Sequence, residues 1–515
     1  MKARNFGFGQ GMALAGICLL GQGNFLWAGS GPLSKGVLGE PAIVAAPQKK
    51  AWQLGDPITF MDGKITLDLQ ERLRLELRNN TFDFNDSLNG PQDDTFLLQR
   101  VRLGLQFKPA AWMKFYVQGQ DTRELFSEDR PDTPFVRGSE GDNTFNLRQA
   151  YGEFGDFKEF PVVVKVGRQE LNYGDERLIG TFDWSNFSRT FDGGKISWQP
   201  RAKTTVDFFA GSVVHMEGYE PLDGDHVWEF NESDWSREQF AGVYATDKEG
   251  LVDFQQTEAY FLYRNKDTND PNYRLTTASP NTFAYDINQE NYTVGFRVVS
   301  TDPKKLAGWD YAADFAYQFG LGGLPGTGAG GRGLQTGLAE SAFAGHVAGG
   351  YNFVSVTGKP RVGLDYALAS GDEDPFDNKS ESFMNLFPTN HKFYGYMDLF
   401  AWKNMHDLSY NAQAKPLEKL TLRFDHHFFW LYTNEDAWYR ANAITAVRPL
   451  NATARNADTF VGHEVDLTAT YAFTKWMNVL VGYSHFFSGA YVKQTSPTGA
   501  DDDADFFYLQ TSFKF

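Results

Sequence analysis

The chain has 515 residues, of which 42% are hydrophobic, 16% aromatic and 22% charged, and its formal net charge is -17. A mean hydropathy of -0.44 and the absence of any apolar run of about 18 residues exclude a membrane protein built from helices. So acidic a chain is not expected to bind nucleic acid or to lie on a membrane through a basic helix. Its many Phe, Tyr and Gly residues favour β structure.

The N-terminal segment has the features of a secretory signal, so we predict a signal peptide at residues 1–28. Lys2 and Arg4 precede an apolar stretch at residues 12–20, and small residues follow it. Cys18, the single cysteine, lies inside this segment, so the exported product is expected to contain none. An exported chain without cysteine fits an envelope protein whose sheet closes on itself and needs no disulfide bonds.

Residues 29–63 are small, rich in Pro and Gly and without periodicity, which predicts a flexible tail on the periplasmic side. From residue 64 onward the pattern changes. Apolar side chains take all but one of the odd positions of residues 65–78 and polar or charged ones take the even positions, and residues 97–108 repeat this alternation. Each of these segments is therefore predicted to be a strand with one apolar and one charged face.

Short connections with Pro, Lys or Gly alternate along the chain with long polar connections rich in Asp, Asn and Gly. Short turns at one rim and long loops at the other are typical of outer-membrane barrels, where the turns are periplasmic and the loops extracellular. We therefore predict that residues 64–515 form an all-β, antiparallel transmembrane barrel of about 18 strands. The predicted strands start near residues 64, 96, 112, 144, 160, 190, 203, 238, 251, 290, 308, 340, 358, 404, 418, 460, 476 and 504.

The last ten residues form an amphipathic segment that ends on Phe515, with Phe507, Leu509 and Phe513 in phase with it. A strand at the end of a soluble sheet would leave an apolar edge exposed, whereas in a barrel it pairs with the first strand. The segment also resembles the recognition signal read by the outer-membrane insertion machinery, which we expect to be a partner of the chain.

The alternation also predicts which charges face the lumen. The predicted inward basic residues of the early strands are Arg72, Arg74, Arg78, Arg100, Arg102, Lys114, Arg148 and Lys165. The predicted inward acidic residues are Asp68, Glu76, Asp207, Asp314, Asp365, Asp425, Glu464 and Asp466. One hypothesis is that the arginines filter acidic solutes, because their planar forks bind carboxylates in a bidentate way. The alternative is that these charges satisfy one another across the wall.

Two longer motifs carry a resemblance to a known family. The first is VGRQELNYGDERLIG at residues 166–180, with LRQAY upstream at residues 147–151, and the second extends over residues 369–395. Over residues 64–515 the chain resembles the alginate export family of outer-membrane barrels. That resemblance implies a monomeric pore of 18 strands with an electropositive constriction for an anionic exopolysaccharide.

By motif, the resemblance implies the following pore-lining residues: Arg148, Arg168, Arg177 and Arg189, with Asp175 and Asp192 as ordering partners. Simple alternation places Arg168 on the same face as the apolar Val166. For Arg168 to line the pore, a bulge at Gly167 must re-aim it, or the residue must lie beyond the membrane zone.

An enzyme in a barrel scaffold is the main alternative class. Asp425 and His427 share a predicted strand face, and His485 follows Ser484, but strand neighbours alone do not make a nucleophile and base. No sequence motif of a hydrolase or metalloprotease accompanies them. We therefore expect no catalytic residue, no metal site and no cofactor.

The remaining unusual segments are predicted to be loops. Acidic clusters at residues 372–378 and 501–505 lack the spacing of a calcium loop, so we expect solvated acidic loops. The Gly-rich residues 320–337 lack the ending of a phosphate-binding loop. Residues 371–403 are long enough to fold inward and narrow the pore. A purely structural or adhesive barrel is disfavoured because about 18 strands enclose an aqueous lumen.

The sequence thus predicts a pore of the bacterial outer membrane that passes anionic polysaccharide or other acidic solutes by facilitated diffusion. A general or oligosaccharide-specific porin is the alternative. The expected partners are membrane lipid, the transported anionic sugar or polymer and periplasmic export proteins, but not nucleic acid.

Overall fold

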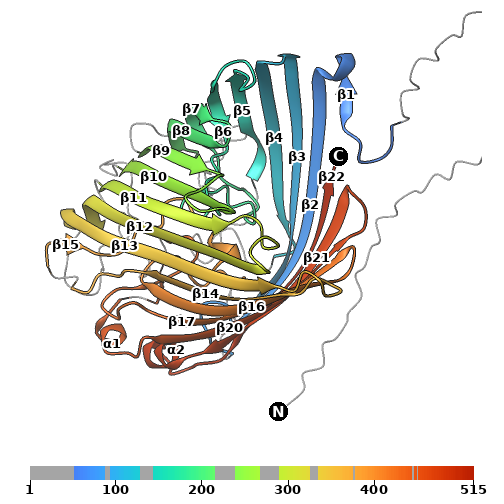
Figure 1. Ribbon diagram of the computed structural model, residues 1–515. Coiled ribbons are helices and arrows are strands. Elements are labelled where there is room, and N and C mark those ends of the chain that lie inside the picture. The colour runs from blue at the N-terminus through green and yellow to red at the C-terminus, as the bar shows by residue number, and fades with distance from the viewer. Residues whose placement is uncertain are drawn as a thin grey trace, which may run out of the picture. The chain divides into compact units, whose positions relative to one another are not determined.

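The computed structural model describes residues 52–86, 93–127, 143–214, 238–266, 289–324, 335–374, 377–443, 446–448 and 450–515. The predicted signal peptide and most of the predicted tail lie outside these residues. The unit Gln53–Phe515 contains one large sheet, which closes on itself (Figure 1). No helix among the described residues has the length and apolar character needed to cross a membrane.

Eighteen antiparallel strands form the closed barrel, as predicted. They are β2 (Ile65–Asn79), β3 (Asp94–Ala110), β4 (Met113–Leu125), β5 (Asn143–Phe154), β6 (Val162–Gln169), β7 (Phe191–Arg201), β8 (Thr204–Val213), β9 (Glu238–Asp247), β10 (Gln255–Lys266), β11 (Gln289–Ser300), β12 (Trp309–Leu324), β13 (Gln335–Asn352), β14 (Arg361–Ala369), β16 (Met405–Leu417), β17 (Leu420–Trp430), β20 (Phe460–Ala472), β21 (Met477–Ser488) and β22 (Ala504–Lys514).

The smaller elements lie in the connections and at the start of the unit. They are β1 (Ile58–Phe60), β15 (Lys379–Ser380), β18 (Trp438–Tyr439), β19 (Ala446–Arg448), the helices α1 (Ala452–Arg455) and α2 (Ala490–Thr495), and the 3-10 turns η1 (Met61–Gly63) and η2 (Asn390–Lys392).

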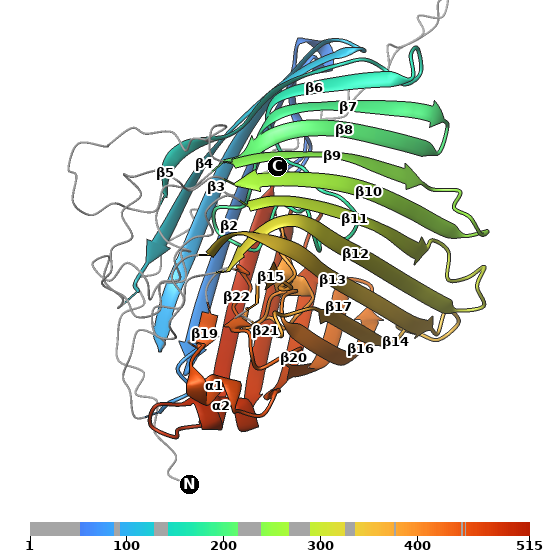
Figure 2. The same ribbon diagram turned by 90° about the vertical axis from the view of Figure 1, so that its left-hand side faces the viewer.

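The barrel closes where the last strand meets the first. Each barrel strand pairs with the next along the chain, and β22 then pairs with β2, with Leu509 opposite Leu75. Two backbone hydrogen bonds between Leu69 and Phe515 complete this seam. Figure 2 shows the tilted strands following one another around the wall. The predicted pairing of the terminal strand is confirmed, and it leaves neither of these strands with a free edge.

The predicted strand starts agree closely with the structure. The largest differences are at β13, which begins at Gln335 rather than near residue 340, and at β10, which begins at Gln255 rather than near residue 251. The predicted tail was wrong at its end, because Ile58–Phe60 form β1 and pair with the beginning of β2. A three-residue strand is too short to show periodicity, so the pattern gave no signal for it.

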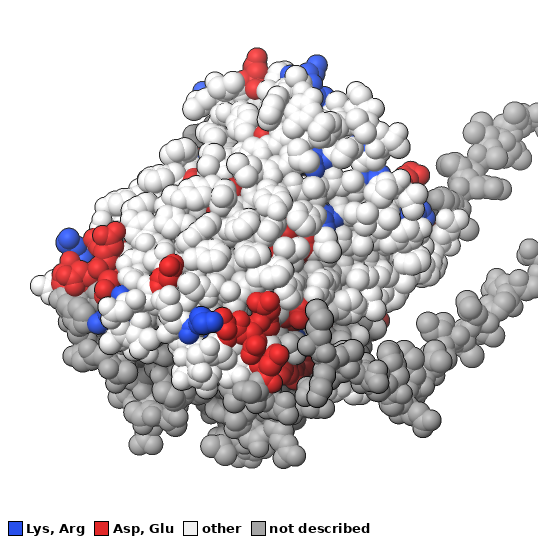
Figure 3. All heavy atoms as spheres, turned by 90° about the horizontal axis from the view of Figure 1, so that it is seen from below, with Lys and Arg blue, Asp and Glu red and all other residues white. Residues whose placement is uncertain are grey.

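The alternation of side chains separates the two faces of the wall. Leu103 and Leu105 on β3 are exposed on the outside, whereas Arg100 and Arg102 on the same strand are buried within the barrel. Figure 3 shows a broad outer face on which charged side chains are sparse and gather mainly toward the margins. An apolar outer band around a polar interior is the arrangement that a lipid bilayer requires of a barrel.

Among the described connections, two position the site from within the lumen. We call residues 170–190, between β6 and β7, the first inner segment, and residues 370–404, between β14 and β16, the second inner segment. Their backbones bond to inward-facing side chains of the wall, among them Arg72 on β2 and Glu464 on β20. The inward folding that the length of residues 371–403 allowed is thus observed.

Candidate pore constriction

The first inner segment is fastened to the wall by arginines from β2 and β3. Arg72 Nη1 donates to the peptide oxygen of Asp183 at 2.6 Å, and Arg74 Nη1 donates to that of Trp184 at 2.6 Å. Arg100 Nη1 donates to the peptide oxygens of Asp183 and Ser185, both at 3.1 Å. Three consecutive peptide oxygens therefore accept hydrogen bonds from guanidinium groups, and these neutral acceptors do not cancel the positive charge of the donors.

Carboxylates compensate only part of this basic wall. Glu76 pairs with Arg74 at 2.6 Å on β2, and Glu170 pairs with Arg148. Arg102 Nη1 lies 2.8 Å from Asp183 Oδ1. The arginines thus hold the first inner segment in place and concentrate positive charge at one side of the lumen, and their role as a filter for acidic solutes stays a prediction.

The two inner segments are joined to each other by a short run of backbone hydrogen bonds. Phe387 donates to Leu178 at 2.8 Å and accepts from Gly180 at 2.8 Å, and Thr389 donates to Glu176 at 2.9 Å. These are parallel-type contacts between segments far apart in sequence. Because one peptide ladder links both segments, displacement of either one disturbs the other.

Arg177 reinforces this junction. Its Nε donates to Asp175 at 3.0 Å, its Nη1 donates to the Tyr394 hydroxyl at 3.0 Å, and its guanidinium lies 4.0 Å from the centre of the Phe393 ring. Its Nη2 is also 3.7 Å from Asp365 on β14. Arg177 therefore ties the first inner segment to the second segment and to the wall.

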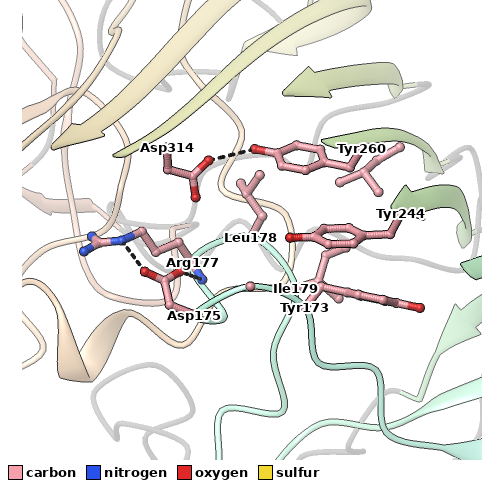
Figure 4. A pocket seen from close by; sticks show the side chains of 10 residues that line it. Tyr173, Asp175, Arg177, Leu178, Ile179, Tyr244, Tyr260 and Asp314 are labelled. Carbon is pink, nitrogen blue, oxygen red and sulfur yellow. Dashed lines mark hydrogen bonds and ion pairs between the residues drawn. The ribbon is translucent and has the colours of Figure 1, made fainter. Parts of the chain in front are cut away.

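The pocket beside Arg177 is nearly filled. Figure 4 shows Asp175, Tyr244 and Tyr260 directed toward it, with the carboxylate of Asp175 turned to Arg177. Tyr173 stacks on Tyr244 with ring centres 4.4 Å apart. The free space is only about 10 Å³, which is about enough for one water molecule. Arg177 and Asp175 are thus structural fasteners here, and their predicted role along the solute path stays a prediction.

A larger cavity lies between the basic wall and the inner segments. It has a volume of about 410 Å³ and opens among residues of β2, β3, β21, β22 and both segments. Its charged lining includes Arg72, Arg100, Asp183, Glu176 and Lys392. Of the predicted pore-lining arginines, Arg72 and Arg100 line this cavity.

Trp184 is held between two cationic or ionisable groups. The guanidinium carbon of Arg74 lies 3.7 Å from the centre of the Trp184 ring, and the His391 ring stacks on the same ring at 3.8 Å. Two groups so close to one ring must occupy its opposite faces. His391 is further bonded to Asp398 at 3.0 Å. The sandwich therefore connects β2, the first inner segment and the second inner segment.

Replacing Trp184 with alanine is expected to loosen both inner segments. The change removes a cation–π contact worth roughly 1–2 kcal/mol and a ring stack worth roughly 1 kcal/mol. Hydrogen–deuterium exchange should rise in residues 183–188 and in residues 389–393. Trp112→Ala, in an exposed turn, is the matched control and should change neither region. Faster exchange in residues 183–188 alone would show that Trp184 does not couple the segments.

The prediction that Arg168 and Asp192 line the pore is corrected by the structure. Arg168 on β6 shares a strand face with Val166, which is 54% exposed, and Asp192 on β7 shares one with Ile196, which is 47% exposed. The two side chains pair with each other at 2.8 Å. No register shift occurs between these strands, so no bulge re-aims them, and the pair lies on the outer face.

The other predicted basic residues lie inside. Arg148 donates to Gln118 at 2.8 Å and to Ser188 at 2.9 Å. Arg189 Nη1 donates to the peptide oxygens of Gly180 at 2.9 Å and Pro388 at 3.1 Å, and burial lowers the pKa of Arg189 to about 10. Both arginines thus hold the first inner segment from within the lumen.

The residues considered for an enzyme have other partners. Ser484 donates to Asp466, and His427 bonds Asp407 at 2.9 Å. His426 bonds His463 at 2.9 Å, on the other face of the strand. Ser484 and His427 are therefore each bonded to a separate carboxylate and not to each other.

The first acidic loop was expected to be solvated, but Asp372 is buried. Its backbone N–H donates to Asp436 at 3.3 Å, and Ser382 donates to the same carboxylate. Burial and the nearby Asp436 raise the pKa of Asp372 to about 7. Within the described part of the chain, no group of three or more His, Cys, Asp or Glu residues is arranged to hold a metal ion.

Sequence reasoning missed the residues that the inner segments bring to the cavity. Asp183, His391 and Lys392 lie in connections without periodicity, so no alternation indicates where they point. The only available signal was their position within or beside the two motifs. Their importance follows from contacts across the lumen, which local sequence does not encode.

A closed barrel with an apolar outer band, a polar lumen and inner segments that narrow it defines a pore of the bacterial outer membrane. The sequence model of the alginate export family matches residues 64–504. The chain therefore belongs to the alginate export family. A search of curated proteins found no match.

Solved structures of outer-membrane porins share the fold. Pseudomonas aeruginosa OccK5 (OpdH) is 12% identical with a TM-score of 0.50, covering 89% of this chain and 99% of that chain. OccK2 (OpdF) from the same species, solved in complex with glucuronate, is 12% identical with a TM-score of 0.50, and the match covers 89% of this chain and 99% of that chain. A BenF-like porin from Pseudomonas fluorescens Pf-5 is 13% identical with a TM-score of 0.51, and the match covers 88% of this chain and 98% of that chain. These family and structural relatives are transport proteins rather than enzymes.

Proposed function

We propose that this pore passes acidic solutes, either anionic polysaccharide or smaller sugar acids, by facilitated diffusion. The observation that carries the proposal is the basic wall of β2, β3 and β5. Three of its arginines, Arg72, Arg74 and Arg100, donate hydrogen bonds to peptide oxygens of the first inner segment. Neutral acceptors leave the charge in place, so the cavity beside this wall favours anions.

The cavity supports a solute that carries a carboxylate and hydroxyl groups. Beside its cations stand neutral polar groups, among them Gln70, Thr181, Asn478, Gln510 and Ser512. Such groups replace part of the hydration shell of a sugar, and the cations attract its carboxylate. Its volume of about 410 Å³ suits one acidic sugar unit, and a polymer would pass as a single extended strand.

A general porin is the second candidate. It is favoured by the fold shared with porins of other names, because one fold serves many solutes. Selectivity separates the two candidates. A general porin would pass small ions of both signs at comparable rates, whereas a pore for acidic solutes would prefer anions.

The proposal is tested in planar bilayers by the reversal potential across a KCl gradient. We expect the parent protein to prefer chloride. The variant Arg72→Gln, Arg74→Gln, Arg100→Gln, Arg102→Gln should lose that preference, because glutamine keeps hydrogen-bond donors for the peptide oxygens but no charge. A unit charge at 4 Å is worth about 1 kcal/mol even in bulk water, so the permeability ratio should fall at least about fivefold.

Arg423→Gln is the control for this experiment. It removes a lumen charge that is paired with Asp425 at 2.6 Å on β17, away from the basic wall. Its effect on the permeability ratio should be much smaller. A parent without anion preference, or an unchanged preference in the fourfold variant, would contradict the proposed function.

A further inference from the structure

The guanidinium group of Arg100, which lines the cavity, and that of Arg102 on the same strand are both paired with a carboxylate from the protein itself. The side chains of Arg100 and Arg102 are only 5% and 4% exposed, whereas that of Asp183, which pairs with both, is 56% exposed. The Asp183 carboxylate lies 3.2 Å from Arg100 Nη2 and 2.8 Å from Arg102 Nη1. A solute carboxylate can therefore reach these two arginines only by taking the place of Asp183.

The covering carboxylate is not what fastens the segment. The peptide oxygens of Asp183, Trp184 and Ser185 accept five hydrogen bonds from Arg72, Arg74 and Arg100. Asn186 adds a side-chain contact with Arg72 at 3.2 Å. These bonds do not involve the Asp183 carboxylate, so the charge of that side chain can change while the anchor is kept.

Asp183 is charged under all ordinary conditions. Burial raises its pKa, but the attraction of Arg100, Arg102 and Arg72 outweighs burial and holds the pKa far below its usual value. The cavity thus contains a permanent negative charge placed on its strongest cations.

We propose that Asp183 is a specificity-determining residue, a tethered carboxylate that competes with acidic solutes for Arg100 and Arg102. This inference rests on the proposed function and concerns the regulation of the same site. A solute must bind well enough to enter and weakly enough to leave. Bare paired arginines would hold a carboxylate in a bidentate way, and Asp183 weakens that hold, so that acidic solutes pass instead of being retained.

The test uses the full-length protein in planar bilayers with sodium glucuronate as the probe. Glucuronate that enters the cavity should transiently block the chloride current, and the block gives both its dissociation constant and its residence time. In Asp183→Asn, the dissociation constant should fall about fivefold or more, since one repelling charge at close range is lost. The blocks should last longer, because affinity changes act mainly on the rate of release.

Two control variants separate charge from structure. Asp183→Glu keeps a carboxylate and should bind glucuronate like the parent, and Glu159→Gln removes one charge from an exposed short turn and should have no effect. Unchanged or weaker glucuronate binding in Asp183→Asn would overturn the inference. So would a larger and noisier open current in that variant, since it would show that the carboxylate is an anchor.

The parent protein distinguishes the two levels of the argument. A parent that prefers chloride and is blocked by glucuronate supports the proposed function whatever Asp183→Asn does. A parent without anion preference overturns the proposed function and the inference together. If the parent prefers chloride but Asp183→Asn binds glucuronate as the parent does, only the proposed role of Asp183 is overturned.

Discussion

Replacing Arg177 with methionine is expected to raise the single-channel conductance, because it releases both inner segments from each other and from the wall. Arg177 is 4% exposed and bonds Asp175, Tyr394 and Asp365. Methionine has similar length but leaves the two carboxylates without this partner. Removing one member of a buried ion pair costs about 3–5 kcal/mol, which is large compared with the energy that holds a loop in place.

Planar-bilayer recordings and urea unfolding in detergent would measure this effect. We expect larger and noisier currents together with a lower unfolding midpoint. Arg177→Lys keeps the charge but not the two directed hydrogen bonds, so it should give an intermediate result. Arg201→Met, at the exposed end of β7, should behave like the parent. A parent-like conductance in Arg177→Met would show that the peptide ladder alone holds the segments.

Substituting Gly395 with alanine should displace the second inner segment. Gly395 has a φ of +82°, and a Cβ there would lie 2.7 Å from Glu464 Oε1. The left-handed backbone costs about 1–2 kcal/mol for a residue with a side chain, and the clash adds roughly 1–3 kcal/mol. The same carboxylate accepts the N–H of Met397 at 2.9 Å, so moving it also breaks that contact.

The unfolding free energy and the conductance would report this change, and a second glycine supplies the control. Gly499 has a φ of +75° with nothing within 4 Å of an added Cβ. Gly499→Ala should therefore lose only the free energy that the left-handed backbone costs, without a clash. We expect Gly395→Ala to be the more destabilised of the two and to conduct more. Equal losses in both variants would contradict a clash with Glu464.

The fold was predictable because its determinants are local. The alternation of apolar and polar residues indicated the two faces of β2 and β3, and Pro, Lys or Gly indicated the short turns. The strand count and the pairing of the terminal strand at Phe515 could therefore be predicted one segment at a time. A barrel repeats the same unit along the chain, an antiparallel strand pair joined alternately by short turns and long loops. One element was missed where the rule does not apply, the three-residue strand β1.

The site was only partly predictable because its contacts join segments far apart in sequence. Strand phase placed Arg72 and Arg100 in the lumen correctly, whereas the family motif placed Arg168 on the wrong face although its phase indicated the outside. Arg177 bonds Tyr394, a residue 217 positions away. No periodicity within either segment predicts such a contact, because each lies in an irregular connection shaped by the lumen around it.

The anchoring of the first inner segment through peptide oxygens has an evolutionary consequence. Every amino acid brings a peptide oxygen, so the bonds from Arg72 and Arg100 to the peptide oxygen of residue 183 place little restriction on the side chain at that position. If Asp183 competes with acidic solutes as proposed, a single codon change at position 183 is expected to alter which solutes are favoured, while the backbone anchor of the segment is inherited unchanged.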